Sequence, residues 1–170
     1  AAVVNNPQFP VRVRFAPLIT FMSVRKTPEQ VFAQVQELEK FSSDKFAMGP
    51  LKFISDGSIQ GRTARMRWPG YCCGSPNGLW LGDPEKLYQQ MLPFHKAGYQ
   101  IAMHANGDEA IEAGVGVFHR LLETHPRFDH RHRVSAGFRR RGAGHCYAAH
   151  RGGAGVHPDV FHGADGEHHV

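Results

Sequence analysis

The chain has no long apolar run and little cysteine. None of its apolar stretches approaches the roughly 18 residues that cross a membrane, and its first residues lack the charged-then-apolar layout of a signal peptide. Its 3 cysteines, two of them adjacent, form no framework of disulfide spacings. We therefore expect neither a membrane span nor a disulfide scaffold, and a reducing, cytoplasmic setting.

The positive charge is concentrated towards the end of the chain. Residues 1–130 carry 14 Lys and Arg against 12 Asp and Glu, a balance of +2. Residues 131–170 carry 6 against 3, a balance of +3, together with 7 of the 12 histidines. The basic character is therefore partly a property of the tail. The 170 residues, 41% of them hydrophobic, suffice for one domain with a core but fall short of the about 250 residues of a (β/α)8 barrel.

Hydrophobic periodicity predicts alternating strands and helices. In chain order we expect strand 11–15 with an extension over 18–22, a helix from Thr27 to about Phe41, strand 51–55, a long loop over 56–82, a helix from Asp83 to about Gly98, strand 99–104, a helix over 108–123 and strand 130–134. Thr27 and Gln30 have the spacing of a capping box. This order predicts an α/β fold of parallel strands with crossover helices.

Residues 99–108 (YQIAMHANGD) contain the most informative pattern. An apolar strand ends in His104, passes through a tight turn and opens a helix at Asp108. Ligands and chemistry collect at this end of the strands in parallel α/β proteins. His104 is therefore a candidate metal ligand or catalytic group, and the alternative is a polar residue that merely closes a strand.

Residues 51–64 (LKFISDGSIQGRTA) repeat the arrangement of a strand followed by a polar loop. Here Lys52 lies inside an otherwise apolar strand, and Asp56, Gly57 and Ser58 form the turn after it. A lysine that faces an interior destabilises the fold unless it is neutralised, paired or modified.

Together the two segments resemble the metal-dependent amidohydrolase superfamily, in the branch (amidohydrolase family 3) that includes N-substituted formamide deformylases. The similarity also takes in residues 78–81 (GLWL), 83–87 (DPEKL) and 129–134 (DHRHRV), and it covers roughly residues 10–134. It implies that this part of the chain is about half of a (β/α)8 barrel.

The resemblance also implies a divalent metal site, with zinc expected first. By motif, Lys52 corresponds to the family's fourth-strand lysine, which is often carboxylated, and His104 to its fifth-strand histidine. The family's metal activates a water that attacks an amide. Carboxylation would turn an interior ammonium into an anionic oxygen ligand. A simple pairing of Lys52 with Asp56 remains the alternative.

Four further residues are weaker candidates. Asp56 and Asp108 are assigned to the catalytic group as acceptors that orient His104 or the loop, although Asp108 is equally explained as a helix N-cap. Arg62 and Thr63 are assigned to substrate binding, through an acyl or carboxylate group. A role in the surface loop explains them equally well.

Other histidines and cysteines carry less weight. His130 and His132 alternate on one predicted strand and have metal-ligand spacing, but in the family they are not the primary ligands. Cys72 and Cys73 lack a second pair, which argues against a zinc ribbon.

The character of the chain changes after Val134. Residues 135–170 are rich in Gly, Ala, Arg and His without a clear period, and Ser135 and Ala136 stand where the family pattern continues with Glu-His. We therefore divide the chain into a partial barrel (1–134) and a tail (135–170), which we expect to be poorly ordered through a frameshift or junction. A natural low-complexity extension is the alternative.

These departures shape the functional hypothesis. The chain shows no early His-x-His strand, no sixth-strand histidine and no assignable eighth-strand aspartate. We expect a fragment of a hydrolase that acts on C–N bonds of a small-molecule amide, inactive as this chain alone, and associating into homo-oligomers through exposed sheet edges. The alternative is a non-catalytic protein whose basic tail binds nucleic acid, against which the tail lacks interleaved aromatic residues.

Overall fold

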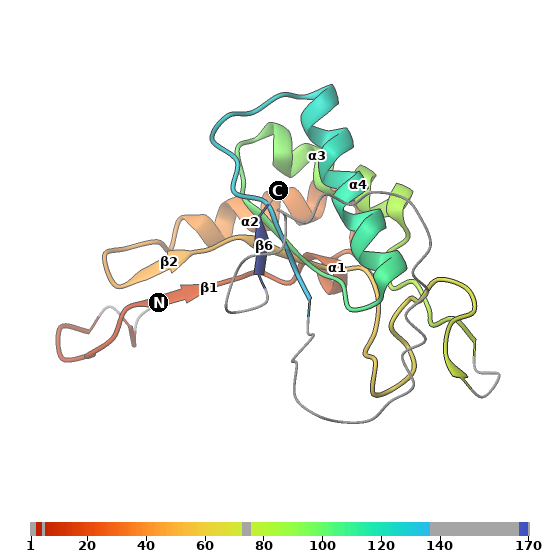
Figure 1. Ribbon diagram of the computed structural model, residues 1–170. Helices are drawn as coiled ribbons and strands as arrows, with labels where there is room; N and C mark the ends of the chain where they lie inside the picture. The colour runs from red at the N-terminus through yellow and green to blue at the C-terminus, as the bar shows by residue number, and fades with distance from the viewer. Residues whose placement is uncertain (1–2, 5, 73–75, 137–166, 170) are drawn as a thin grey trace.

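The computed structural model describes residues 3–4, 6–72, 76–136 and 167–169, the last three by their backbone alone. Within these residues the elements are β1 (Val13–Phe15), α1 (Ile19–Met22), α2 (Pro28–Glu39), β2 (Phe46–Met48), β3 (Leu51–Ile54), α3 (Pro84–Lys96), β4 (Ile101–His104), α4 (Asp108–Thr124), β5 (Arg133–Ser135) and β6 (Glu167–His169), shown in Figure 1. Because residues 137–166 lie outside the described part, the prediction of a poorly ordered tail stays a prediction.

A parallel sheet organises the described residues. β3, β4 and β5 pair in parallel and in that order, and β6 adds antiparallel to β5. This arrangement, with helices between the strands, confirms the predicted α/β class. The described residues form no closed barrel. None of the helices they contain is long and apolar enough to cross a membrane.

β1 and β2 form a second parallel pair beside this sheet. Gly49 and Pro50 separate β2 from β3, and the β1–β2 register ends at the pair of Phe15 and Met48. Beyond that point Leu18 pairs in parallel with Lys52. The segment after β1 therefore runs alongside β3.

Two helices begin where the sequence predicts. Thr27 Oγ1 accepts the N–H of Gln30 (3.4 Å), and Gln30 Oε1 accepts the N–H of Thr27 (3.0 Å), which confirms the capping box of α2. Asp83 caps α3 by accepting the N–H of Lys86 (3.0 Å). Each helix has proline in its first turn, where a missing N–H leaves no bond unmade.

The structure differs from the prediction in three strand regions. The extension over 18–22 is wrong: only Leu18 pairs, and α1 turns back so that Ile19 reaches the core. β2 was not expected, because three residues are too few to show an alternation. β5 begins at Arg133 rather than at residue 130, since His132 is held by side-chain contacts before the strand starts.

One face of the sheet is covered by helices. Leu51 and Phe53 of β3 point to this face, while Lys52 and Ile54 alternate to the other. α3 and α4 pack against each other over the sheet (Figure 1). The core between the sheet and the helices α2, α3 and α4 contains Val31, Val35, Leu51, Phe53, Phe94, Met103, Phe118, Leu121 and Val134. Burial of this apolar surface is the main force that holds the helices on the sheet.

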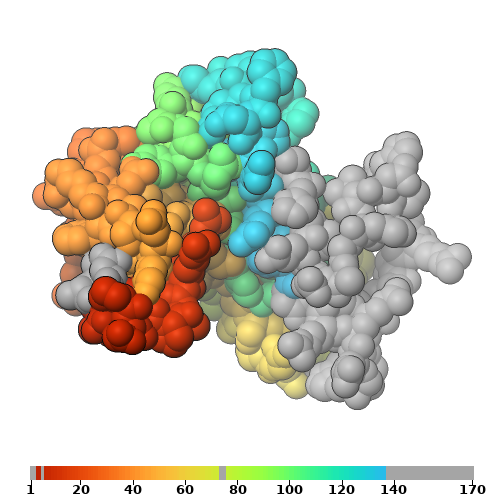
Figure 2. Space-filling model, turned by 90° about the vertical axis from the view of Figure 1, so that its left-hand side faces the viewer, coloured from red at the N-terminus to blue at the C-terminus, as the bar shows by residue number. Residues whose placement is uncertain are grey.

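The N-terminal segment is held against the turn before β2. Figure 2 shows the red residues at the start of the chain beside the orange segment of β2. The Lys45 ammonium donates to the carbonyl oxygens of Asn6 (3.1 Å), Pro7 (2.9 Å) and Phe9 (2.9 Å). A single cation thereby satisfies three acceptors of an irregular segment.

Two buried histidines lie at the end of the sheet where the strands begin. His132 Nδ1 accepts the N–H of Ile101 (3.2 Å), the first residue of β4. Because an N–H can only donate, this nitrogen carries no proton, and neutral His132 is protonated at Nε2. Nε2–H then donates to His95 Nδ1 (2.9 Å), and His95 Nε2–H donates to the carbonyl oxygen of His125 (2.8 Å). This relay is complete only while both rings are neutral.

Arg127 secures the same end of the fold. Its guanidinium donates to the carbonyl oxygens of His95 (3.0 Å), Gly98 (2.8 Å) and Tyr99 (3.1 Å) around the end of α3, and it pairs with Asp129 (2.8 Å). A cation at a helix C-terminus is favoured by the helix dipole. The region between α4 and β5 therefore has a structural role in fixing α3 to β4.

We predict that acid weakens this fold through the relay. Burial, followed by the positive charge of neighbours such as His95, lowers the pKa of His132 to about 3, and burial also lowers the pKa of His95. The unfolded chain takes up these protons near the ordinary histidine pKa of about 6.5. The stabilisation is therefore complete above pH of about 6.5 and declines as pH falls towards about 3. Urea titrations should give a lower midpoint at pH 5.5 than at pH 7.

Two variants isolate the contribution of the relay. His132→Phe should unfold more easily at pH 7, because Ile101 N–H and His95 Nδ1 lose their partner, and its midpoint should change less between the two pH values. His119→Gln alters an exposed histidine of α4 and should keep the full difference. Equal pH dependence in wild type and His132→Phe would refute the assignment.

Candidate functional site

The sheet face opposite the helices carries the two predicted metal ligands. Lys52 pairs with Ala102, and Ile54 pairs with His104. Paired residues of parallel strands lie on the same face, so Lys52 and His104 share this face two positions apart along neighbouring strands. His104 is the last residue of β4. In α/β proteins the catalytic and ligand-binding groups lie at this carboxyl end of the strands. The structure thus brings these two residues to one face.

The end of β4 is tied to the end of β3. Ser55, fully buried, donates both its N–H (3.0 Å) and its hydroxyl (2.7 Å) to the carbonyl oxygen of His104. The His104 ring meets Asn106, with 2.8 Å between His104 Nε2 and Asn106 Nδ2. The same Asn106 nitrogen lies 2.8 Å from the carbonyl oxygen of Gly57. The ring is thus positioned by the loops after both strands.

Asp56 holds these loops together. Its side chain is buried, and its two carboxylate oxygens accept three backbone N–H groups. Oδ1 accepts from Asn106 (2.9 Å), while Oδ2 accepts from Gly107 (2.8 Å) and Arg65 (2.8 Å). Hydrogen bonds to an ionised acceptor are the strong ones. Asp56 thereby determines where the residues that follow His104 lie.

The first part of the long loop closes on itself. Thr63 Oγ1 accepts the N–H of Ser58 (2.9 Å), and the N–H of Thr63 donates to the carbonyl oxygen of Ser58 (2.9 Å). A Cβ at Gly57 would lie 2.2 Å from Thr63 Oγ1, so only glycine fits beneath this closure. Arg62 lies exposed beside it with a φ of 54°. The predicted role of Arg62 and Thr63 in substrate binding stays a prediction.

Asp108 connects the start of α4 to the same loop. Gly107 is the N-cap, and Asp108, the first residue of the helix, accepts the N–H groups of Arg67 (2.9 Å) and Glu109 (2.9 Å). Arg65 and Glu109 form an ion pair beside it (2.9 Å). The contacts of Asp108 therefore favour a structural role at the start of α4. The N-cap itself is Gly107, one position earlier than the sequence suggested.

The described residues supply fewer donors than a metal centre needs. They contain no group of three or more His, Cys, Asp or Glu that could hold an ion. Lys52 and His104 fit a divalent ion by shared face and, for a carboxylated lysine, by donor type. A catalytic zinc site takes three protein ligands and an open position. These two residues could therefore hold an ion only with further donors.

The remaining candidate ligands lie elsewhere or are engaged. His132 belongs to the buried relay at the opposite end of the sheet, and its ring lies 5.4 Å from that of His130 between centroids. Cys72 is exposed, and Cys73 lies outside the described residues. The relay gives the DHRHR pattern a structural explanation.

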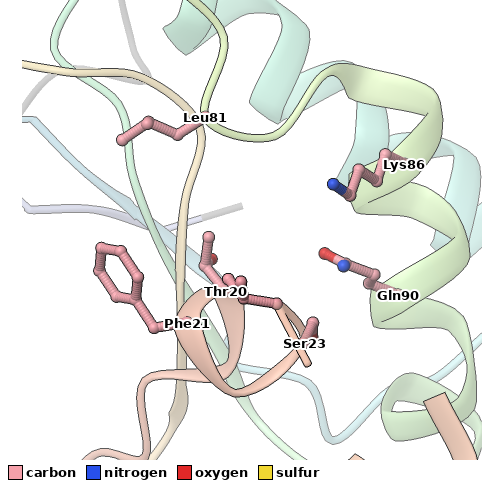
Figure 3. A pocket seen from close by; sticks show the side chains of 7 residues that line it. Thr20, Phe21, Ser23, Leu81, Lys86 and Gln90 are labelled. Atoms are coloured by element: carbon pink, nitrogen blue, oxygen red, sulfur yellow. The ribbon is translucent and has the colours of Figure 1, made fainter. Parts of the chain in front are cut away.

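A small pocket opens between α1 and α3. Figure 3 shows Phe21 and Leu81 on one side and Lys86 and Gln90 projecting from α3. Its volume is about 140 Å³, whereas small-molecule sites usually measure roughly 300–1,000 Å³. None of the predicted site residues lines it. The pocket is therefore no candidate for the substrate site.

Sequence reasoning missed Ser55, Arg65, Asn106 and Gly107 as parts of this region. Gly107 had a usable signal, because a glycine between a strand end and a helix start is typical of a close backbone approach. A Cβ there would lie 1.8 Å from the carbonyl oxygen of Arg65. The contacts of Arg65 and Asn106 join loops far apart in sequence, and no local pattern reveals them.

A pair of glycine variants tests this close approach. Gly107→Ala should destabilise the protein by several kcal/mol, on the order of other strained or overpacked sites, because the carbonyl oxygen of Arg65 must move. Gly116→Ala in α4 meets no atom within 4 Å and should stabilise by about 0.5–1 kcal/mol through helix propensity. Urea unfolding measures both, and a neutral Gly107→Ala would contradict the close loop packing.

Comparison with known proteins agrees with this arrangement. The chain is 33% identical over 97 residues to "Putative amidohydrolase YtcJ" of Bacillus subtilis (57% of this chain, 18% of that protein). It is 31% identical over 94 residues to the protein LONG AFTER FAR-RED 3 of Arabidopsis thaliana (54% of this chain, 16% of that protein). The chain thus spans less than a fifth of the length of these curated relatives.

A solved structure shares the fold. It is an uncharacterized metal-dependent hydrolase from Pyrococcus horikoshii, matched with a TM-score of 0.50 at 22% identity, over 65% of this chain and 26% of that one. The model of the amidohydrolase family matches residues 1–152. This match takes in β1 to β5 and the loops that Asp56 joins, and the chain therefore belongs to the amidohydrolase family.

Proposed function

We propose that this chain forms part of a metal-dependent hydrolase of C–N bonds, of the formamide deformylase type. The observation that carries the proposal is the placement of Lys52 and His104 on one face of a parallel sheet, two positions apart on neighbouring strands. A bound divalent ion would supply an activated water at neutral pH. Membership of the amidohydrolase family agrees with this chemistry.

Each residue has a distinct task in this proposal. His104 gives a ring nitrogen to the ion, and Lys52 gives a carbamate oxygen once carboxylated, which removes the penalty of an ammonium on an interior face. Asp56 and Asp108 act on loop geometry, because their oxygens accept backbone N–H groups. In this proposal Arg62 contacts the acyl or carboxylate part of a small amide substrate, beside the loop that Thr63 closes.

The chain alone is proposed to be inactive as a hydrolase. Two donors hold a zinc ion poorly in a catalytic geometry, and the described residues contain no group of three or more His, Cys, Asp or Glu that could hold an ion. Association of two chains through sheet edges would suit the parallel pair of β1 and β2, whose outer strand β1 pairs within the described residues with β2 alone.

A paramagnetic titration tests the ligand assignment. Co²⁺ added to the ¹⁵N-labelled chain should broaden amide signals of β3 and β4 around Lys52 and His104. His104→Ala should remove this local broadening, because the ring donor is lost. His119→Ala, an exposed matched control, should retain it. Histidines of the tail do not confuse the measurement, since the signals are assigned by residue. Unchanged broadening in His104→Ala would refute His104 as a ligand.

A second measurement addresses the lysine. In ¹³C-labelled bicarbonate with Zn²⁺, a carbamate carbon signal should appear and should be absent in Lys52→Arg, which keeps the charge but does not form the carbamate. Hydrolysis of N-formyl amines by the chain with Zn²⁺ should stay at the rate of the blank. Turnover above the blank would show that two donors and the family scaffold suffice.

A further inference from the structure

The side chain of Asn106 contacts the ring of the proposed ligand, His104. Its Nδ2 lies 2.8 Å from His104 Nε2 and 2.8 Å from the carbonyl oxygen of Gly57. Its backbone N–H is held independently by Asp56 Oδ1 (2.9 Å). The loop position is therefore fixed by the backbone, and the side chain makes a separate pair of contacts.

These contacts determine the orientation of the amide and the position of the ring proton. A carbonyl oxygen can only accept, so the amide nitrogen, not its oxygen, must face Gly57. That nitrogen carries two hydrogens, and the second points to His104 Nε2. Nε2 must therefore accept, and the neutral His104 ring carries its proton on Nδ1.

A metal ion needs the same lone pair. Nε2 of a neutral imidazole has one lone pair, and here it receives the Asn106 hydrogen. Ligation through Nδ1 instead would move the ring proton to Nε2, against the N–H of Asn106. Either mode of binding requires the contact between Asn106 and His104 to break.

We propose that Asn106 is a positioning residue that masks His104. It holds the ring in the Nδ1–H tautomer with the ligating lone pair covered, and a divalent ion binds when the Asn106 side chain rotates away. This inference rests on the proposed function of His104 as a ligand. Asp56 keeps the loop in place during that rotation, because its bond is to the Asn106 backbone.

The first test needs no metal. ¹⁵N spectra of the imidazole nitrogens, recorded at a pH where the rings are neutral, should show the Nδ1–H form of His104. Asn106→Ala should shift the signals towards a mixture of the tautomers, and Asn106→Asp, whose side chain only accepts, should favour the Nε2–H form. Asn6→Ala alters an exposed turn remote in sequence from His104, and the His104 tautomer should stay as in the wild type. An unchanged His104 tautomer in Asn106→Ala overturns the proposal.

The second test measures Co²⁺ affinity through the same local broadening. Asn106→Ala should bind about two- to tenfold more tightly, the range expected for one released hydrogen bond. If His104→Ala binds as wild type does, the proposed function fails while the tautomer test still decides whether Asn106 holds the ring. If His104→Ala loses binding but Asn106→Ala gains none, masking is wrong and the metal assignment stands.

Discussion

The carboxylate of Asp56 is the interaction on which the candidate site depends. The loop after β4, through Asn106 and Gly107, and the stretch at Arg65 in the long loop after β3 direct their backbone N–H groups at this one buried anion. None of these N–H groups lies in a helix or strand ladder, so without the carboxylate they would need water inside a buried region. The DGS and NGD segments are therefore two halves of one structure. The family motif is explained as much by loop assembly as by chemistry.

Polar groups at the two ends of the sheet have different tasks. Where the strands end, Asp56 and Asn106 orient loops around His104. Where the strands begin, His132 and Arg127 satisfy acceptors and donors that the ends of α3 and β4 leave open. Two histidines of one chain thus have opposite roles: His104 has its ring at the candidate site, and His132 is buried in the scaffold.

The sequence predicted the elements whose signals are local. The Thr27 capping box, the Asp83 cap and the apolar strands around Lys52 and His104 are decided by residues within one turn or one strand. The start of α1 at Ile19 was not predictable in this way. A short apolar run has the same pattern whether it continues a strand or forms a short helix whose side chains enter the core.

For the candidate site, the sequence predicted only those features that depend on residues within a single strand or turn. The motifs identified Lys52, Asp56 and His104, and the register places the first and last on one face. They could not reveal that Asp56 accepts three backbone N–H groups or that Asn106 meets the ring, since these bonds join positions about fifty residues apart or depend on a single rotamer.

The His132 ring also limits how this protein can change over generations. Its position requires an acceptor towards Ile101 and a donor towards His95, on separate edges of one flat, buried group that also stacks on Phe118. Neutral imidazole alone among the common side chains offers both in a ring of that size. A single substitution there leaves at least one buried partner unmatched, so drift at this position requires a simultaneous change at its neighbour.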